Sequence, residues 1–223
     1  MICKMKSIVI IGTGNLAEIA IQYIRRDLKN DVVAFSVEKD YNTEKEFCGL
    51  PVINFEDLLH SYPPKTTELL IAIGPNKLSS VRERLYLNAK EQGYKIVTYI
   101  SPRAHIWDHK NIGEGCFIFD GCIVEPETII GENTVMWSGS IVAHHSNIGK
   151  HCFLAPSATI SGKVKVKNNC FIGINATIRD HIIIEEKCII GCGAVIKKNT
   201  IKNGVYSANG TTIYNYDSAN TNV

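Results

Sequence analysis

Residues 130–195 read IGENTV MWSGSI VAHHSN IGKHCF LAPSAT ISGKVK VKNNCF IGINAT IRDHII IEEKCI IGCGAV, with a large apolar residue opening every group of six. The same spacing runs without a break from Ile100 to Ile196. A period of six fits neither an amphipathic helix nor an alternating strand. It does fit a parallel β-helix, in which each unit is one short strand plus a corner and stacked coils bury one another's side chains. The sequence therefore predicts triangular coils of β-helix.

Two further positions of the repeat support this prediction. The fifth residue of each unit is usually small, and glycine often follows the apolar residue, where a tight corner would leave no room for a side chain. These glycines are Gly113, Gly131, Gly149, Gly173 and Gly191. Five cysteines occupy the small position, namely Cys116, Cys122, Cys152, Cys170 and Cys188. We expect these thiols to pack in the core as compact apolar groups and not to bind a metal.

Composition narrows the function classes. The chain has 223 residues, of which 45% are hydrophobic and 21% charged, so it can hold one or two domains with real cores. A formal net charge of +2 gives no reason to expect nucleic acid or a membrane surface as a partner. No apolar run reaches the length of about 18 residues typical of a membrane span, and no signal-peptide pattern is present. Eight cysteines without such a signal favour a reducing compartment, so we expect a cytoplasmic protein.

Strand and helix patterns alternate before the repeat begins. We expect strands at 7–11, 32–36, 69–73 and 95–99, and helices at 16–27, 55–60 and 77–92. This alternation predicts a small Rossmann-like α/β domain with a parallel sheet. We place that domain at residues 1–99, the β-helix at 100–201 and a polar tail at 202–223, with residues 215–223 partly disordered.

The first strand ends in a glycine turn, Gly12-Thr13-Gly14-Asn15, and Ala17 follows in the helix. Glycines at this place let a phosphate approach the N-terminus of a helix. A dinucleotide, a nucleotide diphosphate and a tight turn without a ligand all fit the pattern. The acidic residue expected about 20 residues further on, to bind a ribose, is at best Glu38.

A β-helix with filled walls has no interior pocket, so its chemistry must lie outside, at the corners or between subunits. His144 and His145 occupy corner positions that the core does not explain. Histidine is the usual general base near neutral pH, and backbone N–H groups at glycine corners can bind an oxyanion. The two histidines are therefore our candidate catalytic residues. His105, His109, His151 and His181 are expected to be solvated corner residues.

The chain resembles the hexapeptide-repeat nucleotide-sugar acetyltransferases of bacterial glycan biosynthesis, including the bacillosamine, perosamine and viosamine N-acetyltransferases and the sialic acid O-acetyltransferases. The resemblance rests on the glycine turn, on the stretch 71–76 reading IAIGPN, on the hexads and on the string HHSNIG. It implies a left-handed β-helix, a homotrimer with sites between subunits, and transfer of an acetyl group from acetyl-CoA to an amino sugar carried on a nucleotide. His144 matches the general base of the family, and no metal is implied.

The resemblance also implies where the substrates lie. The nucleotide sugar would contact the first domain at Gly12, Thr13, Gly14, Asn15, Glu38, Gly74 and Asn76. Acetyl-CoA would lie along the β-helix against Ser161, Gly162, Gly173, Ile174, Asn175, Ala176, Gly191, Gly193 and Lys197, with Lys197 or Lys198 near a phosphate. Trp137 should project near the same groove, to contact sugar or pantetheine or to pack against a neighbouring subunit.

One departure from the family pattern concerns the base. The acidic residue that commonly follows it is His145 here, so the carboxylate that would orient the imidazole is missing from that position.

Two other functions compete with acetyl transfer. A zinc hydrase of the γ-carbonic-anhydrase type would need three histidines at a subunit interface, and His144, His145 and His151 superficially offer them. A non-catalytic scaffold that binds a sugar nucleotide or an acyl-CoA is the third hypothesis.

Overall fold

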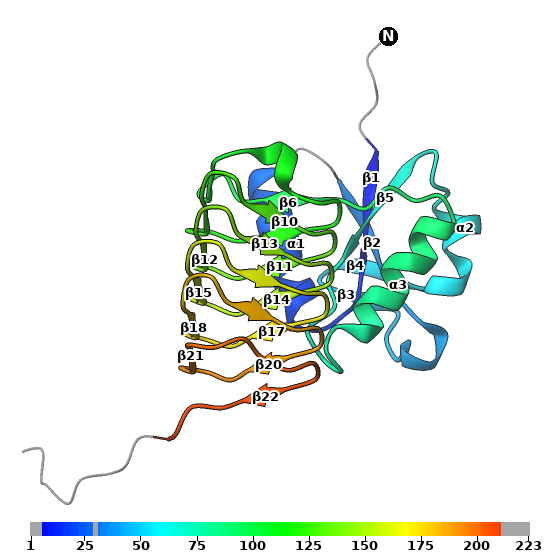
Figure 1. The fold of residues 1–223 in the computed structure, drawn as a ribbon. Helices are drawn as coiled ribbons and strands as arrows, with labels where there is room; N and C mark the ends of the chain where they lie inside the picture. The colour runs from blue at the N-terminus through cyan, green and yellow to red at the C-terminus, as the bar shows by residue number, and fades with distance from the viewer. Residues whose placement is uncertain (1–5, 29–30, 211–223) are drawn as a thin grey trace, which may run out of the picture.

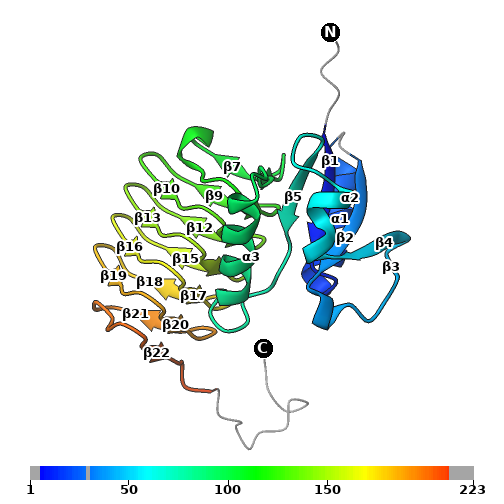
Figure 2. The same ribbon diagram turned by 90° about the vertical axis from the view of Figure 1, so that its right-hand side faces the viewer.

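The computed structural model describes residues 6–28 and 31–210 of the chain. A small α/β domain and a stacked β-helix lie side by side, joined directly at residue 99 (Figures 1 and 2). The expected disorder of residues 215–223 falls outside the described residues.

The α/β domain is built on a five-stranded sheet in the order β3-β4-β2-β1-β5. Its elements are β1 (Ser7–Ile11), α1 (Asn15–Asp27), β2 (Val32–Val37), β3 (Glu46–Phe47), β4 (Leu50–Asn54), α2 (Leu58–Ser61), β5 (Thr67–Ile71) and α3 (Ser80–Glu91), with 3₁₀ turns at Lys39–Tyr41 and Phe55–Asp57. The sheet is mostly parallel, as predicted: β1, β2, β4 and β5 are parallel, and only β3 pairs antiparallel. Apolar residues of α1 pack on one face of the sheet, and those of α2 and α3 pack on the other.

Two details of this domain differ from the prediction. The hairpin of β3 and β4 was not predicted, because its short strands have no clear alternation of apolar and polar residues. The strand expected at 95–99 is wrong, since only Ile96 bridges to Leu69 there and Tyr99 already belongs to the β-helix.

The β-helix is a triangular prism whose three faces are three parallel sheets (Figure 1). The seven-stranded sheet contains β6 (Tyr99–Ile100), β8 (Phe117–Ile118), β11 (Val135–Met136), β14 (Phe153–Leu154), β17 (Phe171–Ile172), β20 (Ile189–Ile190) and β22 (Val205–Tyr206). The six-stranded sheet contains β7 (His105–Ile106), β9 (Ile123–Val124), β12 (Ile141–Val142), β15 (Thr159–Ile160), β18 (Thr177–Ile178) and β21 (Val195–Ile196). The four-stranded sheet contains β10 (Ile129–Ile130), β13 (Asn147–Ile148), β16 (Lys165–Val166) and β19 (Ile183–Ile184), and a 3₁₀ turn covers His109–Asn111.

The core of the prism is the pair of inward positions that the repeat predicted. The large apolar residues from Ile118 to Ile196 are buried there with the five cysteines of the small position. Small hydroxyl and thiol groups at this position donate to a carbonyl 15 residues later in the chain, as Thr134 Oγ1 does to Gly149 at 3.0 Å and Cys152 Sγ to Lys167 at 3.2 Å. Serine, threonine and cysteine therefore suit the small position because they satisfy a backbone acceptor while filling little space. Lys110 also occupies the small position of its unit, but its side chain is exposed.

The predicted glycine corners are confirmed. A Cβ atom at Gly131 would lie 2.6 Å from the backbone carbon of Gly149, one coil further on. No side chain fits between coils at that distance, so the glycines allow the coils to stack.

Each face of the prism has a different environment. The docked face, which is the seven-stranded sheet, is covered by α1 through Phe117, Phe119 and Phe153. The charged face, which is the four-stranded sheet, carries ion pairs such as Lys167 with Glu185. The open face, which is the six-stranded sheet, presents a ladder without charged side chains, namely Ile123, Ile141, Thr159, Thr177 and Val195.

The three edges of the prism also differ. The α1 edge joins the docked and open faces, and Asp120 on it binds Arg26 of α1. The α3 edge joins the docked and charged faces, where the buried Arg82 of α3 donates to the carbonyls of His151 and Cys152 at 3.2 and 3.0 Å. Burial lowers the pKa of Arg82 to about 10. The distal edge, residues 125–127, 143–145, 161–163, 179–181 and 197–199, joins the open and charged faces and is the edge that neither helix contacts.

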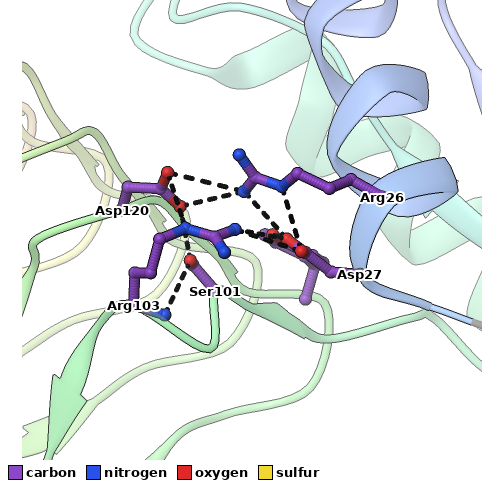
Figure 3. A network of polar contacts seen from close by, with 6 residues as sticks. Arg26, Asp27, Ser101, Arg103 and Asp120 are labelled. Carbon is purple, nitrogen blue, oxygen red and sulfur yellow. Dashed lines mark hydrogen bonds and ion pairs between the residues drawn. The ribbon is translucent and has the colours of Figure 1, made fainter.

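An ionic network fastens α1 to the first coils of the β-helix (Figure 3). Asp27, at the end of α1, accepts from Arg26, Arg103 and the Tyr99 hydroxyl, and Asp120 accepts from Ser101, Arg26 and Arg103. These hydrogen bonds, above all those from Arg26, hold the pKa of Asp27 well below its usual range. The network and the Arg82 contacts fix both helices against the prism.

Candidate functional site

His144 and His145 project from the distal edge, in the corner between β12 and β13. Both side chains are exposed. Their Nδ1 atoms lie 3.1 Å apart, and the two rings meet edge to face at a centroid distance of 5.2 Å. The structure therefore brings the two predicted catalytic histidines into direct hydrogen-bonding contact.

The imidazole of His144 rests on Gly162 of the next coil. A Cβ atom at Gly162 would lie 2.6 Å from Cε1 and 2.7 Å from Nε2 of His144. Gly162 is buried and its backbone is not left-handed, so the backbone itself does not require glycine there. The space left by the missing side chain accommodates the ring.

We expect Gly162→Ala to lower kcat by about tenfold, because the added methyl group forces the imidazole away from its seat and misplacement of a catalytic group by about 1 Å is costly. The melting temperature should stay within about 2 °C of wild type, since the ring is exposed and can move aside. Steady-state kinetics together with a thermal melt measure both quantities. Full activity of the variant would show that the contact between the His144 ring and Gly162 does not affect turnover.

A carboxylate from the preceding coil also holds this corner. Glu125 Oε2 accepts the backbone N–H of His144 at 2.9 Å. This acid acts on the backbone and not on the ring, so it does not replace the carboxylate missing at position 145. Sequence reasoning missed Glu125, although its position one coil before the histidines could have indicated it.

Charge changes sign along the distal edge on either side of the histidines. The coil before them carries Glu125 and Glu127, and the coils after them carry Lys163, Arg179, Lys197 and Lys198, interrupted by Asp180. A polyanionic ligand along this edge would therefore be favoured toward the C-terminal coils, and a cationic group toward the N-terminal coil.

A separate pocket of about 340 Å³ opens where β1, β2 and β5 end in the α/β domain. Four predicted substrate residues line it: Gly12, Thr13, Glu38 and Asn76. Gly12 has φ +116°, and a Cβ atom there would lie 2.9 Å from the carbonyl oxygen of Ala72, so glycine is required. The ends of parallel strands are the usual ligand site of such a sheet.

Polar groups of this pocket include residues that the sequence did not indicate. The hydroxyl of Ser36 is buried and has no hydrogen-bond partner among the described residues. Glu38 binds Arg84 through both carboxylate oxygens, at 2.6 and 2.8 Å, and this pairing lowers the pKa of Glu38. The segment Lys77–Ser79, at the mouth, has three consecutive residues in the left-handed region, a strained conformation of the kind found at binding sites.

Other predicted substrate residues lie elsewhere. Gly14, Asn15 and Gly74 are near the turn but do not line the pocket. The expected position of Trp137 near the histidines is wrong. Its partly buried ring stacks on Phe119 at 4.3 Å, against the apolar cluster between α1 and the docked face, because an outward residue after this sheet faces the α/β domain.

The predicted acetyl-CoA residues fall on two edges. Ser161, Gly162 and Lys197 share the distal edge with the histidines. The others are at or beside the α1 edge, namely Gly173, Ile174, Asn175, Ala176, Gly191 and Gly193. The Ala176 side chain is buried in the prism, so only its backbone is accessible to a ligand. The open face separates these two edges. A ligand that contacts both groups of residues in one chain must therefore cross the open face.

His151 was expected to be solvated, and this is wrong. It is buried on the α3 edge, with Nδ1 2.9 Å from Asn133 Nδ2 and Nε2 3.7 Å from Glu83. Burial lowers the pKa of His151, and the Glu83 carboxylate opposes that shift. His105, His109 and His181 are exposed, as predicted.

The ligand set of the zinc hypothesis is not assembled within one chain, because His151 lies under α3 on a different edge from His144 and His145. In residues 6–28 and 31–210, no three His, Cys, Asp or Glu side chains form a potential metal site. No helix in this part of the chain is long and apolar enough to span a bilayer.

The pocket and the histidines of one chain do not meet. The pocket belongs to the α/β domain, which packs on the docked face, whereas the histidines stand on the opposite edge of the prism.

Comparison with protein families gives two matches. Residues 7–89 match the PglD N-terminal domain, and residues 109–144 and 163–198 match the bacterial transferase hexapeptide (six repeats). A search of curated proteins gives no match.

Several solved structures share the whole fold. A mutant of perosamine N-acetyltransferase from Caulobacter crescentus, in complex with CoA and GDP-perosamine, is 24% identical with a TM-score of 0.82, over 91% of this chain and 93% of that one. PerB from Caulobacter crescentus, with the same two ligands, is 25% identical with a TM-score of 0.80, over 91% and 94%. WeeI from Acinetobacter baumannii AYE is 25% identical with a TM-score of 0.73, over 90% and 96%.

The architecture is thus the predicted one, a small α/β domain followed by a left-handed β-helix. Both family matches fall on the parts of the chain that the glycine turn and the hexads had indicated. The chain thus carries a PglD N-terminal domain followed by bacterial transferase hexapeptide repeats, and it is an acyltransferase.

Proposed function

We propose that this protein is an acetyl-CoA-dependent N-acetyltransferase that acts on a nucleotide-linked amino sugar, such as a 4-amino-4,6-dideoxyhexose, in bacterial glycan or O-antigen assembly in the cytoplasm. The observation that carries the proposal is the exposed His144 imidazole, seated on Gly162 at an edge whose charge changes sign around it. Support comes from PerB, which is similar over most of its length and was solved with CoA and GDP-perosamine.

His144 is the general base of the proposed reaction. The amine reaches the enzyme as an ammonium ion and must lose one proton to solvent before it can attack. As the new C–N bond forms at the thioester carbonyl, Nε2 of His144 takes the second proton. The imidazolium then gives this proton to the departing thiolate as the C–S bond breaks, so the base is regenerated.

The charges along the distal edge favour a different end of that edge for each of the two substrates. The phosphates of acetyl-CoA are favoured beside Lys163, Arg179 and Lys197, on the coils after His144. The amine is favoured near the carboxylates of the preceding coil. The thioester and the amine would then meet at the imidazole between them.

The pocket of the α/β domain is the proposed site of the nucleotide. Its apolar walls suit a base, and Gly12 allows a phosphate to approach the start of α1. Because this pocket and His144 are on opposite sides of one chain, the nucleotide bound by one subunit is presented to the imidazole of another.

The open face is the proposed contact between copies of the chain. The docked face is covered by α1, and the charged face carries Lys165 and the Lys167–Glu185 ion pair beside the exposed Ile129. The open face presents an uncharged aliphatic and threonine ladder, half-buried except for the exposed Val195. A head-to-tail contact closes into a ring when the rotation between neighbouring copies divides a full turn, and we propose a homotrimer. Light scattering should give the mass of three chains.

The function is tested by incubating the protein with acetyl-CoA and a panel of UDP-, GDP- and dTDP-linked amino sugars. CoA release, and a gain of one acetyl group in the sugar nucleotide by mass spectrometry, are expected with at least one member. Absence of acetylated product across the panel would contradict the proposal.

Ser36→Ala should change stability and affinity in opposite directions. Removal of a buried hydroxyl without a partner is expected to raise the free energy of unfolding by up to about 1 kcal/mol. It should weaken nucleotide-sugar binding by about fivefold, because the bound ligand is expected to form a hydrogen bond with the Ser36 hydroxyl and would lose it. Thermal melts with and without the nucleotide sugar measure both, and tighter binding by the variant would place the ligand elsewhere.

A further inference from the structure

His144 and His145 form a pair whose Nδ1 atoms are 3.1 Å apart. Only one hydrogen atom can lie between two nitrogens at this distance, so one ring donates and the other accepts. We propose that His145 is a positioning residue that accepts the Nδ1–H of His144 and so keeps Nε2 of His144 free of a proton. This inference rests on the proposed function, because it assigns the partner of the proposed base.

Backbone contacts to both neighbouring coils hold the pair. From the coil before, Glu125 accepts the N–H of His144 at 2.9 Å, and the carbonyl of Pro126 accepts the N–H of His145 at 3.1 Å. From the coil after, the N–H of Lys163 donates to the carbonyl of His144 at 2.9 Å. The backbone of the corner is therefore fixed by both neighbouring coils. The contact between the two Nδ1 atoms then orients the two rings.

The corner conformation turns the two rings toward each other. His145 has φ +59°, in the left-handed region that corners of this prism use repeatedly. This conformation belongs to the corner that turns the chain from β12 on one face to β13 on the next, where the His145 ring lies edge to face with that of His144. Gly162 below leaves room for the His144 ring to lie flat against the coil.

Two arrangements of protons are possible when both rings are neutral. In the first, His144 carries its proton on Nδ1 and His145 carries its proton on Nε2, which leaves Nε2 of His144 free to act as a base. In the second, His145 donates from Nδ1, and Nε2 of His144 is protonated and cannot act. Only the first arrangement serves the proposed reaction, because the ring of His144, and not that of His145, occupies the seat on Gly162.

A histidine in this role differs from a carboxylate in two respects. It orients the imidazole and sets its tautomer, but it contributes no negative charge to stabilise the imidazolium that forms during attack. In return, the first arrangement leaves His145 with an Nε2–H group that can donate a hydrogen bond to substrate. With histidine at position 145, the orientation of His144 is preserved. The negative charge of the usual carboxylate is replaced by a hydrogen-bond donor, the Nε2–H group of His145.

The tautomers can be read directly by NMR of the intact protein with isotope-labelled histidine, at a pH where both rings are neutral. We expect His144 to carry its proton on Nδ1 and His145 on Nε2 in the wild type. In His145→Ala, His144 should change to the Nε2–H form. A wild-type His144 protonated on Nε2, or a tautomer that His145→Ala leaves unchanged, would overturn the assignment.

Kinetics of two variants provide a second measurement. His145→Ala should lower kcat by about tenfold to a hundredfold, the usual effect of removing a group that orients a functional histidine, while KM for both substrates stays within about twofold. His145→Asn retains an acceptor and tolerates the left-handed conformation, so it should recover most of kcat. Equal loss in both variants would overturn the role as acceptor.

These readouts separate the inference from the function on which it rests. If the wild type acetylates no amino sugar and His144 is the Nε2–H tautomer, both proposals fail. If the wild type is active and the tautomers are reversed, acetyl transfer stands, whereas the role of His145 as acceptor and the role of His144 as base both fail.

Discussion

His144→Ala is expected to lower kcat for acetyl transfer by about a hundredfold to ten-thousandfold, the range typical for loss of a general base. The imidazole is exposed, and its only described side-chain hydrogen bond is to His145, so its removal should not disturb the fold. The affinity for both substrates should change little, because the proposed role of Nε2 begins only when the C–N bond forms. CoA release under saturating substrates, with a thermal melt of the same sample, is the measurement.

His181→Ala is the matched control. His181 occupies the same corner position as His145 two coils later, is also exposed, and shares its left-handed backbone. Its removal should leave kcat within about twofold of wild type, because His181 lies two coils away from the amine and thioester that are proposed to react at His144. Equal turnover in His144→Ala and in the wild type would exclude His144 from the reaction.

Asp27→Ala should destabilise the protein by about 2–3 kcal/mol, because the carboxylate is almost fully buried and accepts several hydrogen bonds. The Tyr99 hydroxyl is left without its acceptor, and the ring of Tyr99 is fully buried, so the unpaired group keeps its desolvation cost. Arg26 and Arg103 lose the carboxylate that they share (Figure 3). Denaturant unfolding measures the change, and Asp180→Ala, at an exposed ion pair of 3.9 Å, should cost less than about 0.5 kcal/mol.

This difference should depend on pH in a defined direction. Hydrogen bonds from Arg26, Tyr99 and Arg103 lower the pKa of Asp27 in the folded state. A carboxyl group with a lowered folded pKa stabilises the fold above its unfolded pKa of about 3.9, and loses that contribution as pH falls further toward the folded value. The unfolding curves of wild type and Asp27→Ala should therefore converge below about pH 4. A gap that stays constant through that range would show that the charge of Asp27 contributes nothing.

The β-helix was predictable from the sequence in detail because its inward positions repeat in register. Each residue of the large and small positions stacks on its equivalents one coil away, so one local rule applies to the whole prism. The same regularity predicted the corner position of His144. It also places Glu125 one coil before the histidines, but Glu125 was missed because only neighbours in sequence were searched for contacts to His144.

The outward residues were not predictable by the same rule, because the repeat does not say which face the α/β domain covers. Trp137 was expected to lie near the groove of the histidines and His151 to face solvent, yet one packs against the cluster under α1 and the other under α3. For the same reason the buried hydroxyl of Ser36 could not be foreseen, since its pocket is formed by strands and a helix distant in sequence.

The most direct test of the account is complementation between two inactive variants. His144→Ala keeps the pocket and lacks the base, whereas Asn76→Trp keeps the base and places a large side chain at the pocket. Co-expression with different affinity tags allows mixed oligomers to be purified. If each site joins the pocket of one subunit to the imidazole of another, mixed oligomers should recover about a quarter or more of the wild-type rate, whereas each variant alone stays inactive. Mixed oligomers as inactive as their parents would contradict a site shared between copies of the chain.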